Sequence, residues 1–351
     1  MGNPTTNYLL NAGIKPAPPD SESDRVSAQA LRMRLLRGEQ EKDVEAEVKA
    51  DFSPEVAYDL SWRVDLSENS FLNVWRQLST AYDRPPSVTA EGVEDMDAIL
   101  SPELWPKQQN RQLIQLGLNE CFVRLDWPMR ADTGEPQEVR YRVVSPDNVY
   151  GCRAHRDHPE RPVYVCELRQ RTKEGDDGQP VNCWTFEHWD VTDPEKPRFW
   201  ITEQVGSQTK DVTNYYLGEV EDYPYRDRDG APILPYVLYH SDVSSRLWSY
   251  QKGVELVRGT LRLAAGYCWW WDAFQSCSSP VRVALDCELP AGTGITMSNG
   301  QPLSSIVYSP KTIIKMSSVL DRSGSIQTFP PGLDPESGLR TLRDFGERLA
   351  I

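Results

Sequence analysis

The sequence predicts an α+β fold in which helices, an antiparallel β-rich region and a long helix follow one another along the chain. In the first third, apolar residues recur at steps of three and four, as on one face of a helix. In the middle third, strand-like runs are separated by turn signals. An unusually long helical pattern follows. The 351 residues are enough for two or three packed units.

Residues 1–50 are predicted to form an N-terminal arm and surface helices. The segment up to about Asp20 contains closely spaced prolines and is expected to be irregular. Charged residues dominate from Arg25 to Lys49, which favours one or two helices at the surface. Further helices are predicted over residues 54–82 and 102–118, the second with Ser101 as its N-terminal cap.

The middle third is predicted to be an antiparallel β-rich unit. Turn signals at residues 175–178 and at Asp229-Gly230 separate the runs. The expected strands cover residues 120–127, 139–144, 163–169, 183–189, 198–202 and 233–239.

A single helix, roughly 45 Å long at 1.5 Å per residue, is predicted from about Ser244 to Gln275. It contains three glycines, each of which weakens a helix by up to about 1 kcal/mol relative to alanine. Neighbouring copies in a closed ring of subunits would stabilise such a helix. We therefore interpret its narrow apolar stripe as an oligomer interface, formed by Val254, Val257, Leu261, Ala264, Cys268 and Trp271.

The last part of the sequence predicts a small insertion and then a second helix. Strands are expected at residues 281–285, 305–308 and 312–316, with a hairpin region at 292–300. The final helix is predicted from Pro335, with Asp334 as its cap. Its apolar pattern is unfinished at Ile351, so we expect the helix to belong to a longer polypeptide.

Composition excludes several classes of protein. The formal net charge of −14 argues against binding of nucleic acid through many neutralised phosphates. No stretch approaches the roughly 20 apolar residues of a membrane-spanning helix, and the N-terminus lacks a secretory pattern. None of the seven cysteines falls in a C-x-x-C pair, which favours reduced thiols.

The sequence contains none of the common nucleotide-binding or hydrolase motifs, and we predict neither catalysis nor a cofactor. Cys152, His155 and His158, with Cys166 further on, have a spacing that could bind zinc. Because charged residues and a proline surround them, a polar loop is the favoured interpretation.

Two further groups of residues have alternative interpretations. Glu187 and Asp190 near His188 could serve acid–base chemistry, but an acidic chain brings carboxylates together by chance, and a solvated β-edge is favoured. The run Trp269-Trp270-Trp271 could stack bases, but consecutive helical positions point about 100° apart. Burial against different neighbours, including adjacent subunits, is favoured.

Several stretches resemble the portal proteins of tailed bacteriophages. They are the end of the predicted helix at residues 78–86, the passage at residues 118–123 and 143–150, and the segment Ile233-Leu234-Pro235-Tyr236-Val237. The resemblance implies a wing over residues 51–243, a first stem helix over 244–279, a clip of α/β structure over 280–334, and the start of a second stem helix over 335–351. Portals usually continue into a loop that points at DNA and then a crown, which this sequence does not contain.

The resemblance implies a structural subunit of a homo-oligomeric ring, usually a dodecamer, at the capsid vertex of the virion, after assembly in the host cytoplasm. Viral double-stranded DNA would pass through the channel during packaging and ejection. The implied partners are the major capsid protein, the terminase and a head–tail adaptor; no membrane is implied. The alternatives are a hydrolytic enzyme with a carboxylate site in the β-rich unit, or another ring-forming virion adaptor. No DNA-contacting residue is assigned.

Overall fold

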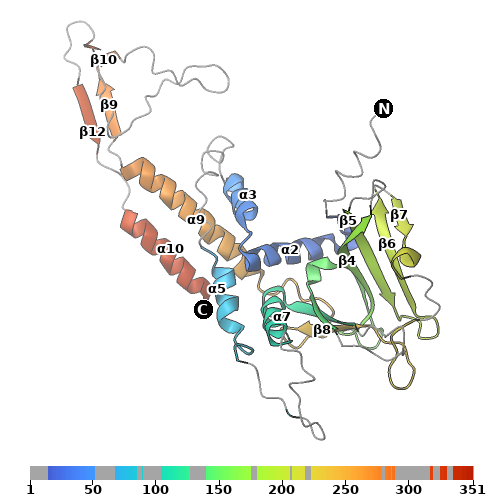
Figure 1. Cartoon of the computed structure of the whole chain (residues 1–351). Helices are drawn as coiled ribbons and strands as arrows, with labels where there is room; N and C mark the ends of the chain where they lie inside the picture. The colour runs from blue at the N-terminus through green and yellow to red at the C-terminus, as the bar shows by residue number, and fades with distance from the viewer. Residues whose placement is uncertain are drawn as a thin grey trace, which may run out of the picture. The chain divides into compact units, whose positions relative to one another are not determined.

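The computed structural model describes residues 15–51, 68–84, 89, 104–126, 140–174, 180–205, 208–217, 223–278, 281–285, 287–288, 317–318, 325–329 and 335–350. The chain divides into two units. The first consists of residues 1–43 and 69–260, and the second of residues 44–68 and 261–351. Helices and antiparallel sheets occur together, which confirms the predicted α+β class (Figure 1).

Two antiparallel sheets lie at the centre of the first unit. In the three-stranded sheet, β1 (Glu120–Asp126) lies between β2 (Arg140–Val144) and β8 (Tyr236–His240). The five-stranded sheet has the order β3-β4-β5-β6-β7. Its strands span Val149–Ala154, Pro162–Glu174, Pro180–Asp190, Arg198–Val205 and Gln208–Asp211. Each of the predicted strands in this region is confirmed within a few residues, whereas β3 and β7 were not predicted.

Side chains from both sheets meet in one hydrophobic core. Along β5 every second side chain is buried, as the two-residue period of a strand requires. Trp189 is 2% exposed, and its ring centroid lies 3.7 Å from that of Phe199. The buried members of the core are Phe122, Val144, Val149, Val165, Trp189, Tyr223, Tyr225 and Tyr236. The inward faces of the two sheets therefore pack on each other.

The helix over residues 23–37 completes the first unit and is more buried than predicted, whereas within residues 41–50 of the same charged segment only Val44 and Val48 are buried. Helix α2 (Ser23–Arg37) packs against α7 (Leu104–Leu118) and, less extensively, α5 (Ser70–Leu78), after a short 3-10 turn, η1 (Asp20–Glu22). Two of its arginines, Arg25 and Arg32, are buried because they donate to backbone carbonyls, as Arg25 does to Pro146 O at 3.1 Å. Charge content alone does not reveal such pairing.

The helix ends are set by local chemistry that the sequence pattern only partly predicts. Helix α2 ends at Gly38, whose φ of +74° is the left-handed conformation that favours glycine. Helix α5 spans Ser70–Leu78, and it begins there because the Asn69 side chain accepts a hydrogen bond from Leu72 N–H at 3.0 Å. The predicted continuous helix over 54–82 is therefore wrong where it crosses Asn69. Residues 52–67 and the predicted cap Ser101 lie outside the described residues.

The long helix α9 (Val254–Ser278) begins ten residues later than predicted. Lys252 N–H donates to Ser249 O at 2.9 Å, which closes a turn, and Gly253 has a φ of +70°. These residues cannot be part of a regular helix, so α9 spans about 37 Å at 1.5 Å per residue. The structure also contains two shorter helices, α3 (Glu41–Asp51) and α8 (Thr213–Leu217).

In the second unit, α9 runs antiparallel to α10 (Pro335–Ala350), which confirms the predicted final helix (Figure 1). Glycines bring the two helices close together. A Cβ at Gly266 would lie 2.7 Å from Leu342 Cδ2, and one at Gly338 would lie 2.9 Å from Trp270 Cδ1. These glycines therefore allow the helices to pack, in addition to weakening them individually.

The described part of the insertion between α9 and α10 consists of strands. Strand β9 (Val281–Leu285) pairs antiparallel with β12 (Ser325–Phe329), and β10 (Cys287–Glu288) pairs with β11 (Ser317–Ser318). The predicted strand at 281–285 is confirmed. The predicted strands at 305–308 and 312–316, the hairpin region and the cap Asp334 lie outside the described residues.

Candidate functional site

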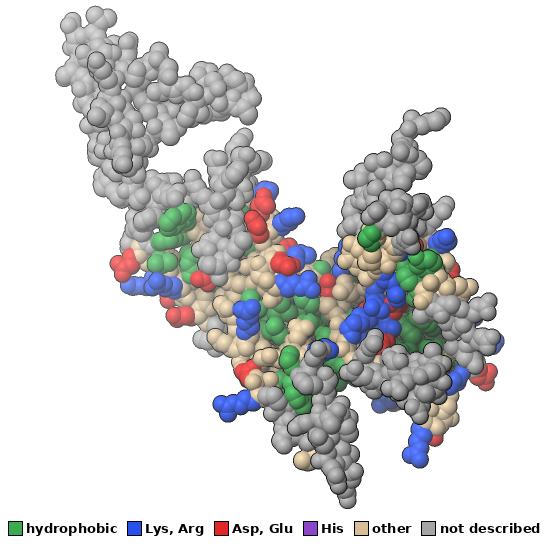
Figure 2. Space-filling view, in the orientation of Figure 1, with side chains coloured by type: hydrophobic (Ala, Val, Ile, Leu, Met, Phe, Trp, Pro, Cys, Tyr) green, Lys and Arg blue, Asp and Glu red, His purple; other side chains and the backbone are tan. Residues whose placement is uncertain are grey.

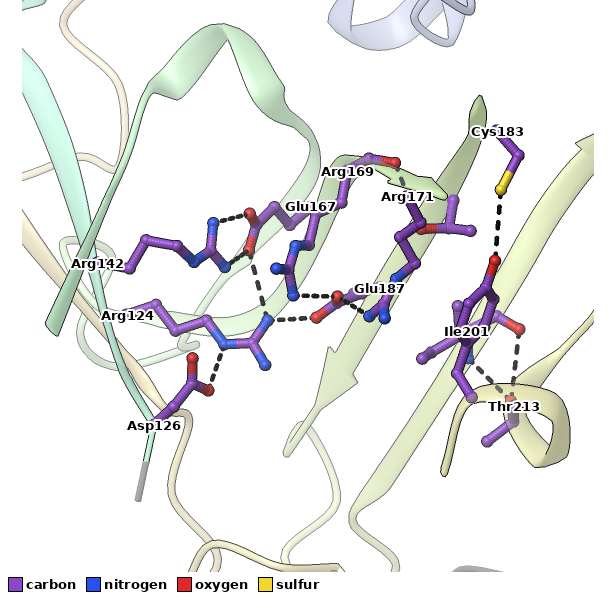
Figure 3. A network of polar contacts seen from close by, with 12 residues as sticks. Arg124, Asp126, Arg142, Glu167, Arg169, Arg171, Cys183, Glu187, Ile201 and Thr213 are labelled. Carbon is purple, nitrogen blue, oxygen red and sulfur yellow. Dashed lines mark hydrogen bonds and ion pairs between the residues drawn. The ribbon is translucent and has the colours of Figure 1, made fainter. Parts of the chain in front are cut away.

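A network of buried and half-buried charges lies between the two sheets of the first unit (Figure 3). It joins side chains from β1 and β2 of one sheet to side chains from β4 and β5 of the other. We call it the charge network, and its members are Arg124, Asp126, Arg142, Glu167, Arg169, Arg171 and Glu187.

Glu187 is the centre of the charge network. Its side chain is fully buried, its Oε2 accepts from Arg124, and its Oε1 accepts from Arg169 at 2.6 Å and from Arg171. Burial by itself would raise the pKa of this carboxyl, but the charges of Arg124 and Arg169 lower it to about 2. Glu187 is therefore charged at all physiological pH values.

Arg124 links the two sheets. Its Nε donates to Asp126 at 2.7 Å, and its guanidinium lies 5.2 Å from the ring centroid of Trp189. Its Nη1 also lies 3.6 Å from Glu167 Oε2, to which the Tyr236 hydroxyl donates at 2.7 Å. Burial opposes the charge of Arg124, but its acidic neighbours keep its pKa raised, so the cation is retained.

The strand register explains why the charges meet. Glu167 on β4 lies directly opposite Glu187 on β5, a like-charge pair that destabilises a sheet if left alone. Arg124, from the facing sheet, contacts both carboxylates. One signal for these residues is present in the sequence. Glu167 and Arg169 lie two and four residues after Val165, so in a strand their side chains point to the same face as this buried valine.

The predicted solvated edge around Glu187 is wrong, because β5 lies between β4 and β6. His188 points to the opposite face of the sheet from Glu187, and Asp190 pairs with Arg153 at 2.6 Å. Both oxygens of Glu187 are held by arginines, so this carboxylate is a poor proton acceptor at neutral pH.

His188 belongs to an aromatic ladder on the outer face of the five-stranded sheet. Its ring stacks on Trp200 with centroids 4.6 Å apart. Its Nδ1 lies 2.9 Å from Tyr164 OH and its Nε2 lies 3.0 Å from Thr202 Oγ1. Burial lowers its pKa to about 4. The imidazole is therefore a neutral structural group.

This neutral histidine gives the first unit a predictable response to acid. In the unfolded chain His188 takes up a proton near pH 6.5, whereas in the fold it does so only near pH 4. The contribution of the neutral His188 to the free energy of unfolding is complete above about pH 6.5. As the pH falls toward 4, roughly 2 to 3 kcal/mol of it is lost. We expect His188→Gln to flatten the fall of unfolding free energy over this range in denaturant titrations, whereas the exposed His155→Gln should leave it unchanged. Equal slopes in both variants would contradict the assignment.

The four residues with zinc-like spacing do not come together. Cys152 and Cys166 belong to adjacent strands, but Cys166 pairs with Gly151, so the two thiols point to opposite faces of the sheet. Burial raises the pKa of each thiol to about 12. His155 and His158 are exposed, with ring centroids 5.4 Å apart. Among the described residues, no group of three or more potential ligands could hold a metal ion.

The predicted stem stripe is largely covered within one chain. Val257, Leu261, Ala264 and Cys268 are buried, Val254 is half-buried, and Trp271 is 44% exposed.

Two of the three tryptophans of α9, Trp270 and Trp271, have their ring centroids 6.2 Å apart. Trp270 faces Gly338 of α10, whereas Trp269 and Trp271 are partly exposed. The part of the stripe that could contact another copy is therefore the end around Trp271.

The chain matches no protein-family model, and no curated protein is significantly similar to it. In the described part of the chain, none of the helices has the length and apolar character needed to cross a bilayer.

Proposed function

We propose that the chain is a structural subunit of a bacteriophage portal. The observation that carries this proposal is the antiparallel pair α9–α10, with paired strands inserted between the two helices and an α+β unit before them. This order corresponds to the wing, stem, clip and second stem helix implied by the resemblance. The partners proposed with it are further copies of the chain, the major capsid protein, the terminase, a head–tail adaptor and the DNA that passes through the channel.

The surface of the helix pair supports an assembly role. Trp269 and Trp271 on α9 and Phe345 on α10 are all more than a third exposed, and exposed aromatic side chains are enriched at interfaces between subunits.

Figure 2 shows Lys and Arg side chains interspersed with Asp and Glu on the visible face, in a chain of net charge −14. Such a surface suits a channel through which DNA slides better than one that binds phosphates.

The direct test is the size of the particle that the full chain forms. Mass photometry and negative-stain images of the purified protein should show closed rings of many copies around a central hole. A protein that remains monomeric at micromolar concentration would overturn the proposal.

A variant of the exposed end of the stripe tests the interface. Trp271→Glu places a charge at a surface position, so the chain should fold, but ring assembly should fall at least about tenfold because the charge would be desolvated between subunits. Leu261→Asp would be less informative, because Leu261 is buried within the chain. Tyr215→Glu, at an exposed position on α8, is the matched control. Intact rings of the Trp271 variant would show that this end of the stripe is not an interface.

A further inference from the structure

The first unit contains a second buried glutamate that is held quite differently from Glu187. Glu120, at the start of β1, is fully buried. Its Oε1 accepts from Ser249 N–H, and its Oε2 accepts from the Gln29 side-chain amide at 3.2 Å. Both of these donors are neutral, whereas Glu187 is bound by three arginines.

The arginines near Glu120 donate to other groups. Arg25 donates to Glu22 at 2.6 Å and to two backbone carbonyls, and Arg32 donates to Gly117 O at 3.1 Å and to Lys252 O. Both face Glu120 from α2 and favour its charged form only through space.

Arg25 and Arg32 are the charged groups that act most on Glu120, and two charged groups on the neighbouring segment have other partners. Glu255, on the first turn of α9, acts on Arg32, and the Lys252 ammonium pairs with Asp242 at 3.1 Å. Burial dominates and raises the pKa of Glu120 to about 7, although the hydrogen bonds from Ser249 and Gln29 oppose it.

Glu120 is also part of the group that holds the chain segment leading into α9. The Asn119 side-chain amide donates to Ser249 O and to Lys252 O, each at 3.0 Å. Arg32 donates to the same Lys252 carbonyl. Asn119 has a φ of +70°, in the left-handed region that few residues other than glycine adopt. This uncommon backbone conformation occurs at the same residue whose side chain binds the segment.

We propose that Arg32, Asn119 and Glu120 form a proton-sensitive latch on the segment from Ser249 to Gly253, closed while Glu120 is neutral and loosened when it is charged. Opening of the latch exposes the carboxyl to water, where it returns to the ordinary acidity of a glutamate and releases its proton. A rise in pH through neutrality therefore favours the open form. The latch controls how firmly the start of α9 is held to the first unit, whatever assembly the chain forms.

Hydrogen exchange measured by mass spectrometry tests the latch in the full chain. After correction for intrinsic exchange rates, protection of peptides within residues 241–257 should fall at least about tenfold between pH 5.5 and pH 8.5, because the open form gains from ionisation of Glu120. Peptides from β4 and β5 provide an internal reference within the same unit and should show little change.

Two variants sharpen the experiment. Glu120→Gln keeps the shape and one acceptor oxygen, as a protonated carboxyl does, but cannot ionise, so the protection of residues 241–257 should be independent of pH. Glu39→Gln removes one negative charge at an exposed position and should behave as the unmodified chain. The proposal is overturned if the unmodified chain shows no pH-dependent loss of protection at 241–257, or if Glu120→Gln retains that loss. Because the first comparison needs no variant, a folding defect in Glu120→Gln would not leave the question open.

Discussion

Glu187→Gln is expected to destabilise the first unit by about 3 kcal/mol, at the lower end of the range for breaking a buried ion pair, because the buried Arg124 and the partly exposed Arg169 and Arg171 lose their common negative partner while Arg124 keeps Asp126 and Glu167. The neutral amide still fills the space of the carboxylate, so the effect reports charge rather than packing. The fold lowers the pKa of Glu187 to about 2, from about 4.5 in the unfolded chain. Its contribution to the free energy of unfolding is therefore complete above about pH 4.5 and is lost only as the pH falls toward 2.

Denaturant unfolding followed by tryptophan fluorescence at pH 7 would measure this loss. The matched control in the same unit is Glu160→Gln, the same chemical change in the exposed pair of Glu160 with Arg161. Such pairs contribute about 0.5 kcal/mol or less. A cost below about 1 kcal/mol for Glu187→Gln would mean that the charge network does not stabilise the contact between the sheets.

Trp189→Ala is expected to cost about 3 to 5 kcal/mol, as for other large aromatic side chains removed from a core. Its ring packs against Phe199 and Tyr225, with centroids 3.7 Å and 5.1 Å away, and against the Arg124 guanidinium. The same unfolding measurement would test it. Tyr215→Ala, at a position 64% exposed on α8, should change stability by no more than about 0.5 kcal/mol, and a similar loss in both variants would contradict the assigned core.

The sequence pattern predicted those elements whose burial repeats regularly. β5 alternates buried and half-buried side chains along most of its length, and its strand pattern was therefore visible. β7 is a short polar strand at a sheet edge, so it carries no such alternation. β3 includes Gly151 and a register shift, which also obscure the pattern. The turn before α9 is local, but Asn119, which holds it by donating to Lys252 O, lies 133 residues earlier, and no local pattern contains that contact.

The alternation of β4 indicates inward positions for Glu167 and Arg169, but the partners in the charge network could not be predicted, for a related reason. Glu187 is stabilised by Arg124, 63 residues earlier in the chain and on the other sheet. From the sequence, an acidic residue in a strand indicates a solvated position. Only the pairing of β1 with β2 and β8, and the packing of this sheet on β4 and β5, turns Glu187 into a buried group.

The glycine contacts between α9 and α10 have a mechanical consequence. Trp270 lies over Gly338, and Leu342 lies over Gly266. Each large side chain therefore packs where the facing residue of the other helix has no side chain. A slip of α10 by one turn, about 5.4 Å, would set Trp270 against Leu342 instead of a glycine. The two helices therefore have one well-defined axial alignment, and any shift between them must be a discrete step rather than a gradual slide.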